Sequence, residues 1–376
     1  MPTEISALPP SGHVSWNELV GQADDSHWDP LPHPGRLRGA RILVTGAGGF
    51  IGAEMVRGFA ASGAERIVLL DLCEQHLFEI FSEMTALGCG DRCIPVLGSV
   101  CDRTLLAAVF AEHRPEIVLH AAALKHVPLM ERNPIAAVET NALGTWMVAQ
   151  AAEEQGCRQM VLVSTDKAVE PRSIMGASKR IAELVMLAPA VMRKAAVRLV
   201  NVIGSPGSVV PLFAEQIARG GPVTVTHSEA RRYFFTLRRT AHVLASAIDA
   251  QLAGVLVPVP GEAVKIADLA RRMIASSGFS AEIVFTGLRP GEKLDEALTG
   301  PGEEPNSPAS LLLHRVTSPR VEGFAAHADA LEAAIAAREG SELLRLVCDL
   351  VPDYQPGELV RNSAAASAGR LAPLSP

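Results

Sequence analysis

The sequence predicts an α/β protein built on a Rossmann-type, doubly wound parallel sheet, with a smaller C-terminal substrate-binding portion. Three observations predict this fold. Short apolar runs that suit buried parallel strands alternate with segments of helical periodicity from about residue 39 to residue 203. A glycine-rich turn joins the first apolar run to the first helical segment. Beyond Asn201 the alternation becomes mixed, and glycine–proline pairs interrupt it.

The expected elements follow one another in strand–helix order. Strands are predicted at residues 41–45, 65–70, 93–97, 117–120, 160–164 and 195–199. Helices are predicted at residues 53–60, 102–113, 134–154, 176–187, 325–338 and 341–351. Asp102 and Asn133 are expected as N-caps, and Pro134 suits the first helical position. Right-handed crossovers between such strands place helices on both faces of the sheet.

The chain divides into five expected segments. Residues 1–38, rich in proline, histidine and tryptophan, are expected to form an irregular arm. Residues 39–203 are expected to form a cofactor-binding Rossmann domain, and residues 204–300 a substrate-binding portion interwoven with it. Residues 301–361 are expected to form a helical extension, and residues 362–376, rich in alanine, serine and proline, a disordered tail.

Composition excludes several classes of protein. A chain of 376 residues with 48% hydrophobic residues can fill a sizeable core. Its net charge of −7 gives no reason to expect nucleic acid or an anionic membrane as a partner. We see neither a run of about twenty apolar residues nor a basic segment leading into an apolar one at the start. A cytoplasmic protein without a membrane span is therefore expected.

The six cysteines predict free thiols and no metal site. None forms a C-x-x-C pair, and the spacing of Cys89, Cys93 and Cys101 fits no common zinc pattern. Unpaired thiols are what a reducing compartment favours.

The glycine-rich turn predicts a dinucleotide site. Gly46 permits the tight turn, Gly49 lets backbone N–H groups approach a pyrophosphate, and Gly52 lets the helix pack closely on the strand. The positive end of that helix faces the phosphates. Asp71 ends the second strand about twenty residues later, where its carboxylate would bind the adenosine ribose and repel a 2′-phosphate, which favours NAD over NADP. The expected cofactor contacts are Gly46, Gly48, Gly49, Phe50, Ile51, Gly52, Asp71, Ala121, Ala122 and Lys179.

An acid, a base and a second lysine follow the fifth predicted strand. Thr165, Asp166 and Lys167 stand at its carboxyl end, where ligands bind in such sheets. Met175 and Lys179 lie one turn apart on the next helix, in the positions of a Tyr-x-x-x-Lys pair. Methionine is neither acid nor base, so Met175 would only shape the pocket, and neither of the two tyrosines has a lysine four residues later.

Two of these assignments have alternatives. Taken alone, Asp166 and Lys167 also fit a surface ion pair at the end of a strand. Asn141, within the long helix of residues 134–154, fits equally a polar group that reaches the active site and a surface amide.

Together these motifs resemble the CapD-type polysaccharide-biosynthesis family of extended short-chain dehydrogenase/reductases, which includes UDP-N-acetylglucosamine 4,6-dehydratases. The resemblance extends from about residue 15 to Pro356. It is carried by residues 45–52, 120–131, 164–168, 175–180, 201–208, 232–236, 287–293 and 350–356. Phe50 replaces the serine common in the family's glycine turn, and the membrane-spanning region of many members is absent.

The resemblance implies an NAD-dependent dehydratase that acts on UDP-N-acetylglucosamine. Such an enzyme oxidises the sugar at C4, eliminates water across C5 and C6, and returns the hydride to C6. It leaves a UDP-4-keto-6-deoxy-N-acetylhexosamine. The resemblance implies Lys167 as the C5 base, Asp166 as the acid for the C6 hydroxyl and Thr165 as a contact of the C4 hydroxyl. Lys179 would hold the nicotinamide ribose, and methionine-bearing members are associated with retention at C5.

A nucleotide diphosphate requires local cations. Arg232 and Arg289 are the preferred candidates, because a guanidinium can bind phosphate oxygens in bidentate fashion. The other expected substrate contacts are Lys125, Asn201, Ser208 and Glu292. Relatives often pair the helices at residues 134–154 and 176–187 across a two-fold axis, so we expect a homo-oligomer.

Two other functions remain as alternatives. A UDP-sugar 4-epimerase, or a related enzyme acting on a specialised nucleotide sugar, would keep the oxidation at C4 and omit this elimination. A non-catalytic nucleotide-sugar sensor belongs to a different class, and the intact Thr165, Asp166 and Lys167 argue against it.

Overall fold

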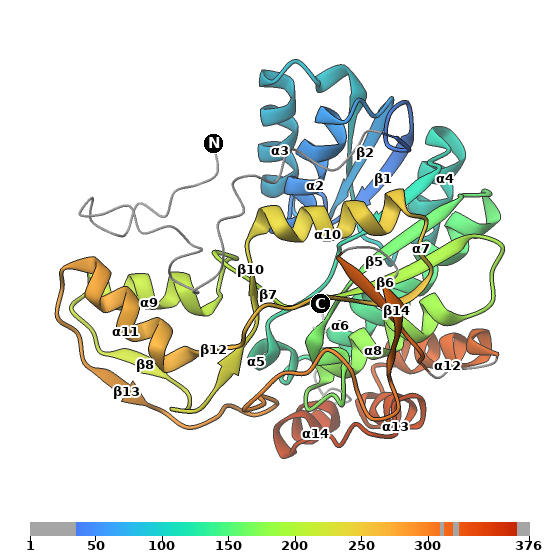
Figure 1. Ribbon diagram of the computed structural model, residues 1–376. Helices are drawn as coiled ribbons and strands as arrows, with labels where there is room; N and C mark the ends of the chain where they lie inside the picture. The colour runs from blue at the N-terminus through green and yellow to red at the C-terminus, as the bar shows by residue number, and fades with distance from the viewer. Residues whose placement is uncertain (1–34, 309–311, 319–322, 367–376) are drawn as a thin grey trace, which may run out of the picture.

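A nine-stranded sheet forms the centre of the computed structural model, which describes residues 35–308, 312–318 and 323–366 (Figure 1). The strand order is β14-β15-β11-β6-β5-β4-β1-β2-β3. The seven strands from β11 to β3 in that order are parallel, and β15 and β14 join the edge at β11 in antiparallel fashion. The connections run in opposite directions from β1 and β4, so the predicted doubly wound sheet is confirmed.

The strands are short, and β1, β2, β4, β5 and β6 are almost wholly buried, as their apolar runs predict. They span β1 (Arg41–Thr45), β2 (Arg66–Asp71), β3 (Cys93–Leu97), β4 (Ile117–His120), β5 (Gln159–Thr165), β6 (Arg193–Leu199), β11 (Gly254–Pro258), β14 (Pro305–Pro308) and β15 (Leu313–Val316). The side chains of β1, β4 and β5 form the middle of the main hydrophobic core. Helices on both faces exclude water from them, which is the environment that parallel strands require.

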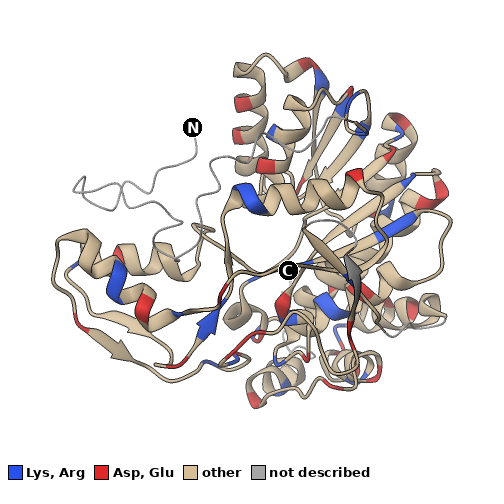
Figure 2. Ribbon diagram, viewed as in Figure 1, with Lys and Arg blue, Asp and Glu red and all other residues tan. Residues whose placement is uncertain are grey.

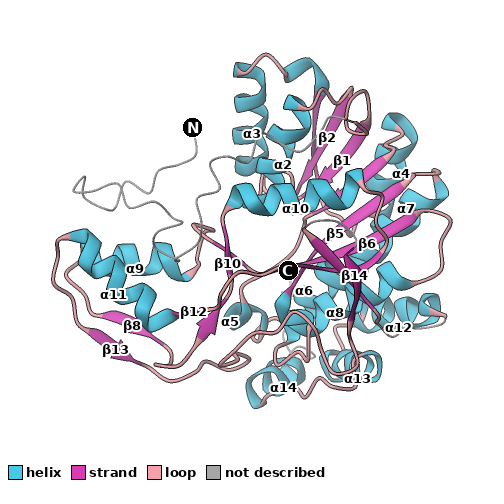
Figure 3. Ribbon diagram, in the orientation of Figure 1, coloured by secondary structure: helices cyan, strands magenta, loops and turns pink. Residues whose placement is uncertain are grey.

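Helices cover both faces of the sheet (Figure 3). One layer contains α2 (Phe50–Ala61), α3 (Glu74–Ala86) and α10 (Leu237–Asp249). The other contains α4 (Arg103–His113), α7 (Gly144–Glu154) and α8 (Ile174–Leu187). The helix α3 was not predicted.

A smaller unit lies beside the carboxyl end of the sheet, at the left of Figure 1. It consists of α9 (Val209–Ala218), α11 (Ile266–Ser277), the pair β8 (Val223–Val225) and β13 (Ile283–Phe285), and the pair β9 (Arg231–Arg232) and β12 (Val264–Lys265). It has a hydrophobic core of its own. The chain enters through β7 (Asn201–Val202), which pairs with β10 (Phe234–Phe235), leaves to form α10 and β11, and then returns. This path fixes the small unit to the sheet at several points.

The long helix expected at residues 134–154 contains a π turn. It consists of α6 (Pro134–Val138), the π turn η2 (Glu139–Leu143) and α7. Pro134 begins α6, as predicted. Asp102 caps α4 by accepting a hydrogen bond from the N–H of Leu105. Asn133 stands at the N-cap position of α6, as predicted, but its side chain makes no capping bond, and its amide donates to the carbonyl of Leu129.

The C-terminal part differs from the prediction. Residues 301–361 were expected to be helical, yet β14 and β15 extend the central sheet before α12 (Phe324–Ala336), α13 (Gly340–Leu350) and α14 (Glu358–Ala365). Helix α14 also includes residues 362–365, so a disordered tail from residue 362 is wrong at these positions. Residues 1–34 of the expected arm and residues 367–376 of the expected tail lie outside the described residues.

The C-terminal helices pack on α6, α8 and η2. This is the face through which the sequence analysis expected two chains to pair. Almost all of α8 is already buried within one chain. The homo-oligomer stays a prediction, and its contact surface would include α12–α14 or another face.

A buried group of charges joins the sheet, α8 and the C-terminal segment. The guanidinium of Arg198, on β6, is fully buried and donates hydrogen bonds to the carboxylates of Glu183 on α8 and Glu303. Glu183 also accepts hydrogen bonds from Ser164 and Arg180. Burial alone raises the pKa of Glu183, but Arg198 outweighs it and the pKa falls to about 2. The carboxylates are stable there only because the cation is present.

Arg198→Met is expected to destabilise the fold by about 3–5 kcal/mol, because it leaves Glu183 and Glu303 buried without their main cation. The matched control is Arg345→Met, since Arg345 pairs with Glu342 and Asp349 on the exposed face of α13. The control should leave the unfolding midpoint unchanged. Urea unfolding followed by circular dichroism measures both. Equal midpoints for Arg198→Met and the wild type would contradict the assigned role of Arg198.

Candidate active site

Thr165, Asp166 and Lys167 meet in one hydrogen-bonded group where β5 ends. The short helix η3 (Asp166–Ala168) follows directly, so the chain turns sharply and these side chains stay together. The ammonium of Lys167 donates to Asp166 Oδ1 at 2.9 Å, and the hydroxyl of Thr165 donates to the same oxygen at 2.9 Å. Asp166 is 1% exposed. A surface ion pair is therefore excluded for this carboxylate.

Two further polar groups surround Lys167. Asn201, at the start of β7, accepts a hydrogen bond from its ammonium at 3.3 Å. Glu296, which the sequence analysis did not assign, places Oε1 3.8 Å from the same nitrogen with a side chain only 3% exposed. Glu296 lies just past the motif at residues 287–293 and far from Lys167 in sequence. Only the fold brings the two side chains together.

The charges at this site shift one another's proton affinities. Burial by itself lowers the pKa of Lys167, but the carboxylates of Asp166 and Glu296 outweigh it, and the pKa is raised overall. Burial raises the pKa of Glu296, and the cation of Lys167 only partly offsets this effect. Perturbed titratable groups gathered in one place are typical of a catalytic site.

Helix α8 places Met175 and Lys179 beside this group. Its N-cap, Ser173, accepts a hydrogen bond from the N–H of Gly176, which starts the helix. A Cβ on Gly176 would overlap the carbonyl of Lys167, so only glycine lets the first turn lie this close. Met175 is buried, and burial lowers the pKa of Lys179 to about 8, although Glu183 opposes the shift.

The glycine turn after β1 forms a narrow cradle that fits a dinucleotide. Gly46 has φ 66°, and a Cβ there would lie 2.7 Å from the backbone nitrogen of Ala122. A Cβ on Gly48 would lie 2.5 Å from the backbone of His76, and one on Gly52 would overlap the carbonyl of Gly46. Helix α2 begins without a side-chain cap, so its first N–H groups can face an anion.

Asp71 lies at the carboxyl end of β2, beside the cradle. Its carboxylate accepts hydrogen bonds from the backbone N–H groups of Gly48 and Cys73, each at 2.9 Å. These bonds fix the carboxylate in place. A carboxylate has about four lone-pair sites, so acceptor capacity remains for a ribose.

A network of buried hydrogen bonds links the strands and helices that carry the site. His120 contacts the hydroxyls of Thr45 and Thr145 through its two ring nitrogens, at 2.6 and 3.0 Å. Burial lowers the pKa of His120 to about 3, and Lys179 adds to the shift, so the ring stays neutral. Asn141 is fully buried in η2 and bonds both backbone groups of Leu124 and the hydroxyl of Ser178. The interpretation of Asn141 as a surface amide is therefore wrong. Its side chain links the segment after β4 to α8.

The expected substrate residues divide into two kinds. Arg232 is buried and donates to three backbone carbonyls, those of Arg231, Lys293 and Leu294. Glu292 accepts hydrogen bonds from Thr226 and from the N–H of Arg289. Arg232 and Glu292 thus hold the segment that carries Glu296, whereas the sequence predicted that both contact the substrate.

The other expected substrate residues have fewer bonds to the protein than Arg232 and Glu292. Arg289 is exposed, and no ion pair of its guanidinium occurs within the described ranges. Ser208 occupies the N-cap of α9, and its buried hydroxyl has no partner among the residues that the structure describes. Lys125 donates to the carbonyl of Pro206 at 3.0 Å. Figure 2 shows basic and acidic residues interspersed over both units, so an anionic substrate depends on such single groups.

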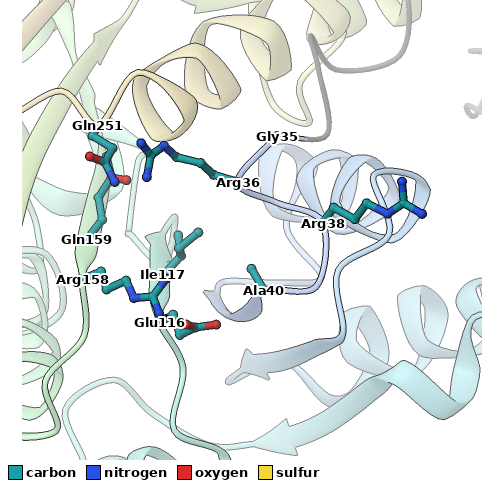
Figure 4. A pocket seen from close by; sticks show the side chains of 9 residues that line it. All are labelled: Gly35, Arg36, Arg38, Ala40, Glu116, Ile117, Arg158, Gln159 and Gln251. Atoms are coloured by element: carbon teal, nitrogen blue, oxygen red, sulfur yellow. Dashed lines mark ion pairs between the residues drawn. The ribbon is translucent and has the colours of Figure 1, made fainter.

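A cavity of about 250 Å³ lies at the opposite end of the sheet (Figure 4). It is lined by residues that precede β1, β4 and β5, among them Arg36, Arg38, Glu116 and Arg158. Because ligands in such sheets bind at the carboxyl ends of the strands, this cavity is separate from the candidate active site.

Within the described residues, no three side chains of the metal-ligand types are grouped to hold a metal ion. The six cysteines are unpaired. None of the described helices is both long and apolar enough to cross a bilayer.

Known proteins share this fold and much of this sequence. The family model described as "Polysaccharide biosynthesis protein" matches residues 42–311. Capsular polysaccharide biosynthesis protein CapD of Staphylococcus aureus is 45% identical over 299 residues, which cover 77% of this chain and 50% of CapD. The probable polysaccharide biosynthesis protein EpsC of Bacillus subtilis is 42% identical over 277 residues, which cover 71% of this chain and 46% of EpsC. The chain thus spans about half the length of these two relatives.

A third relative and a solved structure match over more of their own lengths. UDP-N-acetylglucosamine 4,6-dehydratase (inverting) of Campylobacter jejuni is 30% identical over 266 residues, which cover 68% of this chain and 76% of that protein. The crystal structure of Pen from Bacillus thuringiensis superposes with a TM-score of 0.69 at 26% identity, covering 75% of this chain and 89% of Pen. The chain therefore belongs to the polysaccharide biosynthesis protein family and has the short-chain dehydrogenase/reductase fold, as its motifs predicted.

Proposed function

We propose that the protein is an NAD-dependent UDP-sugar 4,6-dehydratase whose substrate is UDP-N-acetylglucosamine. One observation carries the proposal: the half-buried Thr165 and Lys167 bond the buried carboxylate of Asp166 at the carboxyl edge that also holds the glycine cradle. Elimination of water needs an acid and a base in one place, and this group contains both. The name of the Campylobacter jejuni relative supports the same reaction.

The cradle residues would hold NAD. Gly46 to Gly52 would surround the pyrophosphate, Asp71 would accept hydrogen bonds from the adenosine ribose, and Lys179 would bind the nicotinamide ribose. When bound, NAD would supply the reversible oxidation of the sugar C4 hydroxyl. Solved structures of similar fold whose titles name bound NAD support this cofactor.

Thr165 and Asp166 would handle the proton of the C4 hydroxyl. The hydroxyl of Thr165 already donates to Asp166 Oδ1, so a proton can pass from the sugar through Thr165 to the carboxylate. This path replaces a tyrosine, because the buried thioether of Met175 cannot accept a proton. Asp166, once protonated, can donate to the departing C6 hydroxyl. It then returns to its starting state.

Lys167 would remove the C5 proton as a neutral amine and later return it. A single base on one side of the ring gives the proton back to the side from which it came. We therefore propose retention at C5, which differs from the inverting outcome in the name of the Campylobacter jejuni relative.

Arg289, Ser208 and the N-terminus of α9 would bind the diphosphate. An exposed guanidinium and open N–H groups at the start of a helix are suited to phosphate. Lys125 and Asn201 would contact the sugar. The guanidinium of Arg232 would act indirectly, since it holds the segment that carries Arg289.

A UDP-sugar 4-epimerase is the second candidate. A UDP-glucose 4-epimerase of Rickettsia canadensis is 37% identical over 194 residues, which cover 50% of this chain. An epimerase has no need of a base at C5 or of an acid at C6. The Asp166–Lys167 pair thus favours elimination.

Incubation with UDP-N-acetylglucosamine and NAD in deuterated water tests the function. The expected product is a 4-keto-6-deoxy sugar with solvent deuterium at C5, because the lysine ammonium exchanges with water before it returns a proton. Mass spectrometry and NMR measure this. Unchanged mass with inverted C4 would support the epimerase instead, and no reaction with several UDP-hexosamines would reject both.

Lys167→Ala and Asp166→Asn are each expected to lower kcat by about 10²-fold or more, because each removes one proton-transferring group. NAD affinity, measured by calorimetry, should stay within about twofold of the wild type. Lys265→Ala is the matched control, since Lys265 pairs with Glu229 on the exposed face of the small unit. Turnover like that of the wild type in either site variant would refute its role.

Asp71→Asn is expected to weaken NAD binding about tenfold, because a charge-assisted hydrogen bond to the ribose is worth ~1.5 kcal/mol or more. The same change should narrow the preference for NAD over NADP, since the repulsion of a 2′-phosphate is removed. Titrations with both cofactors measure this. An unchanged ratio of the two dissociation constants would contradict the placement of Asp71.

A further inference from the structure

Glu296 is a second buried carboxyl group that faces Lys167. Its Oε1 lies 3.8 Å from the ammonium of Lys167. Glu296 belongs to the segment whose backbone carbonyls accept hydrogen bonds from Arg232. Its Oε2 has no hydrogen-bond partner within the described residues, and the same is true of Asp166 Oδ2. Two buried carboxyl groups therefore face the same amine through Oδ1 and Oε1, and each keeps its other oxygen without a hydrogen bond in the described part of the chain.

The charges around Glu296 come from three places. Asp166 and Lys167 face it from η3, and Arg232 faces it from β9. Lys293, on its own segment, lies 3.7 Å from Oε2 but donates its hydrogen bond to the carbonyl of Val169. Burial and the neighbouring Asp166 raise the pKa of Glu296 above its ordinary value, despite the three cations. Glu296 is thus a better proton acceptor than an exposed glutamate.

The proposed function leaves one proton without a destination. Lys167 rests as an ammonium paired with Asp166, yet it must be a neutral amine before it can remove the C5 proton. Asp166 cannot take the ammonium proton, because it has to receive the proton of the C4 hydroxyl. A third group with a free acceptor is required, and Met175 cannot serve.

We propose that Glu296 is a positioning residue that accepts the proton of Lys167 and so prepares its amine to act as a base. This inference rests on the proposed function. In the transfer, one N–H bond of the ammonium breaks and one O–H bond forms on Glu296 Oε1. An ammonium and a carboxylate become an amine and a carboxylic acid, so no net charge is created in the buried site. The proton returns to Lys167 when the cycle ends.

The dependence of kcat on pH tests this role. In the wild type, activity is expected to rise with pH as Glu296 loses its proton and becomes able to accept one. Glu296→Gln keeps the size of the side chain but cannot accept the proton, so Lys167 must release it to water. The rising limb should then move to alkaline pH, towards the range of lysine, with a loss of about 10²-fold near neutrality that disappears as the pH is raised.

Two variants separate this role from a structural one. Glu296→Asp retains a carboxyl group and should keep the rising limb of the wild type, at a reduced rate. Glu262→Gln, at an exposed site of the same half of the chain, is the control and should change nothing. A loss in Glu296→Gln that is equal at every pH would show a structural role and overturn the proposal, as would an unchanged profile.

A measurement without substrate distinguishes failure of this inference from failure of the proposed function. Labelling of Lys167 by an amine reagent, followed by mass spectrometry over a range of pH, gives the pKa of its ammonium in the NAD-bound protein. Glu296→Gln should lower that pKa, because a carboxylate that stabilises the ammonium is removed. An unchanged value refutes the coupling between Glu296 and Lys167. If the coupling is found but the wild type makes no 4-keto-6-deoxy sugar, the proposed function fails, and the proton transfer inferred from it fails as well.

Discussion

The guanidinium of Arg198 fixes the parts of the site relative to one another. It lies between Glu183 of α8 and Glu303 of the C-terminal segment, and Glu183 also accepts a hydrogen bond from Ser164. Ser164 directly precedes Thr165, and α8 carries Met175 and Lys179. One set of buried charges thus aligns the end of β5 with α8. Because buried charges tolerate little displacement from their partners, this alignment is rigid.

The second group of charges, Asp166 and Glu296 around Lys167, has fewer hydrogen bonds than the group around Arg198. Every carboxylate around Arg198 has its cation, whereas Asp166 and Glu296 each keep an oxygen without a hydrogen bond among the described residues. Such open groups reduce stability, and proteins usually retain them where a ligand or a reaction uses them. The fully paired Arg198 group thus stabilises the fold around a site whose own carboxylates are not fully hydrogen-bonded.

Local patterns predicted most of the fold and part of the site. The strands of the parallel sheet, the glycine turn and the Thr165–Lys167 group follow from residues adjacent in sequence. Glu296 and β15 were missed because each depends on contacts between distant segments, and β14 joins the sheet only through β15. The role of Arg232 could not be predicted for a different reason. The sequence of a motif does not tell whether its arginine binds a phosphate or backbone carbonyls, because that depends on the path of the backbone around the guanidinium. Asn133 occupies the predicted N-cap position, yet its side chain bonds the carbonyl of Leu129 and no N–H of the helix.

The antiparallel pairing of β15 with β11 has a consequence for how the chain acquires its structure on the ribosome. Until β15 and α12–α14 have been synthesised, β11 presents the unpaired backbone of a growing edge, and the apolar surface of α8 is uncovered. Exposed edges and apolar surfaces of this kind are where nascent proteins aggregate. The nascent polypeptide therefore keeps an unpaired strand edge and uncovered apolar surface until the residues from Leu313 onwards have emerged.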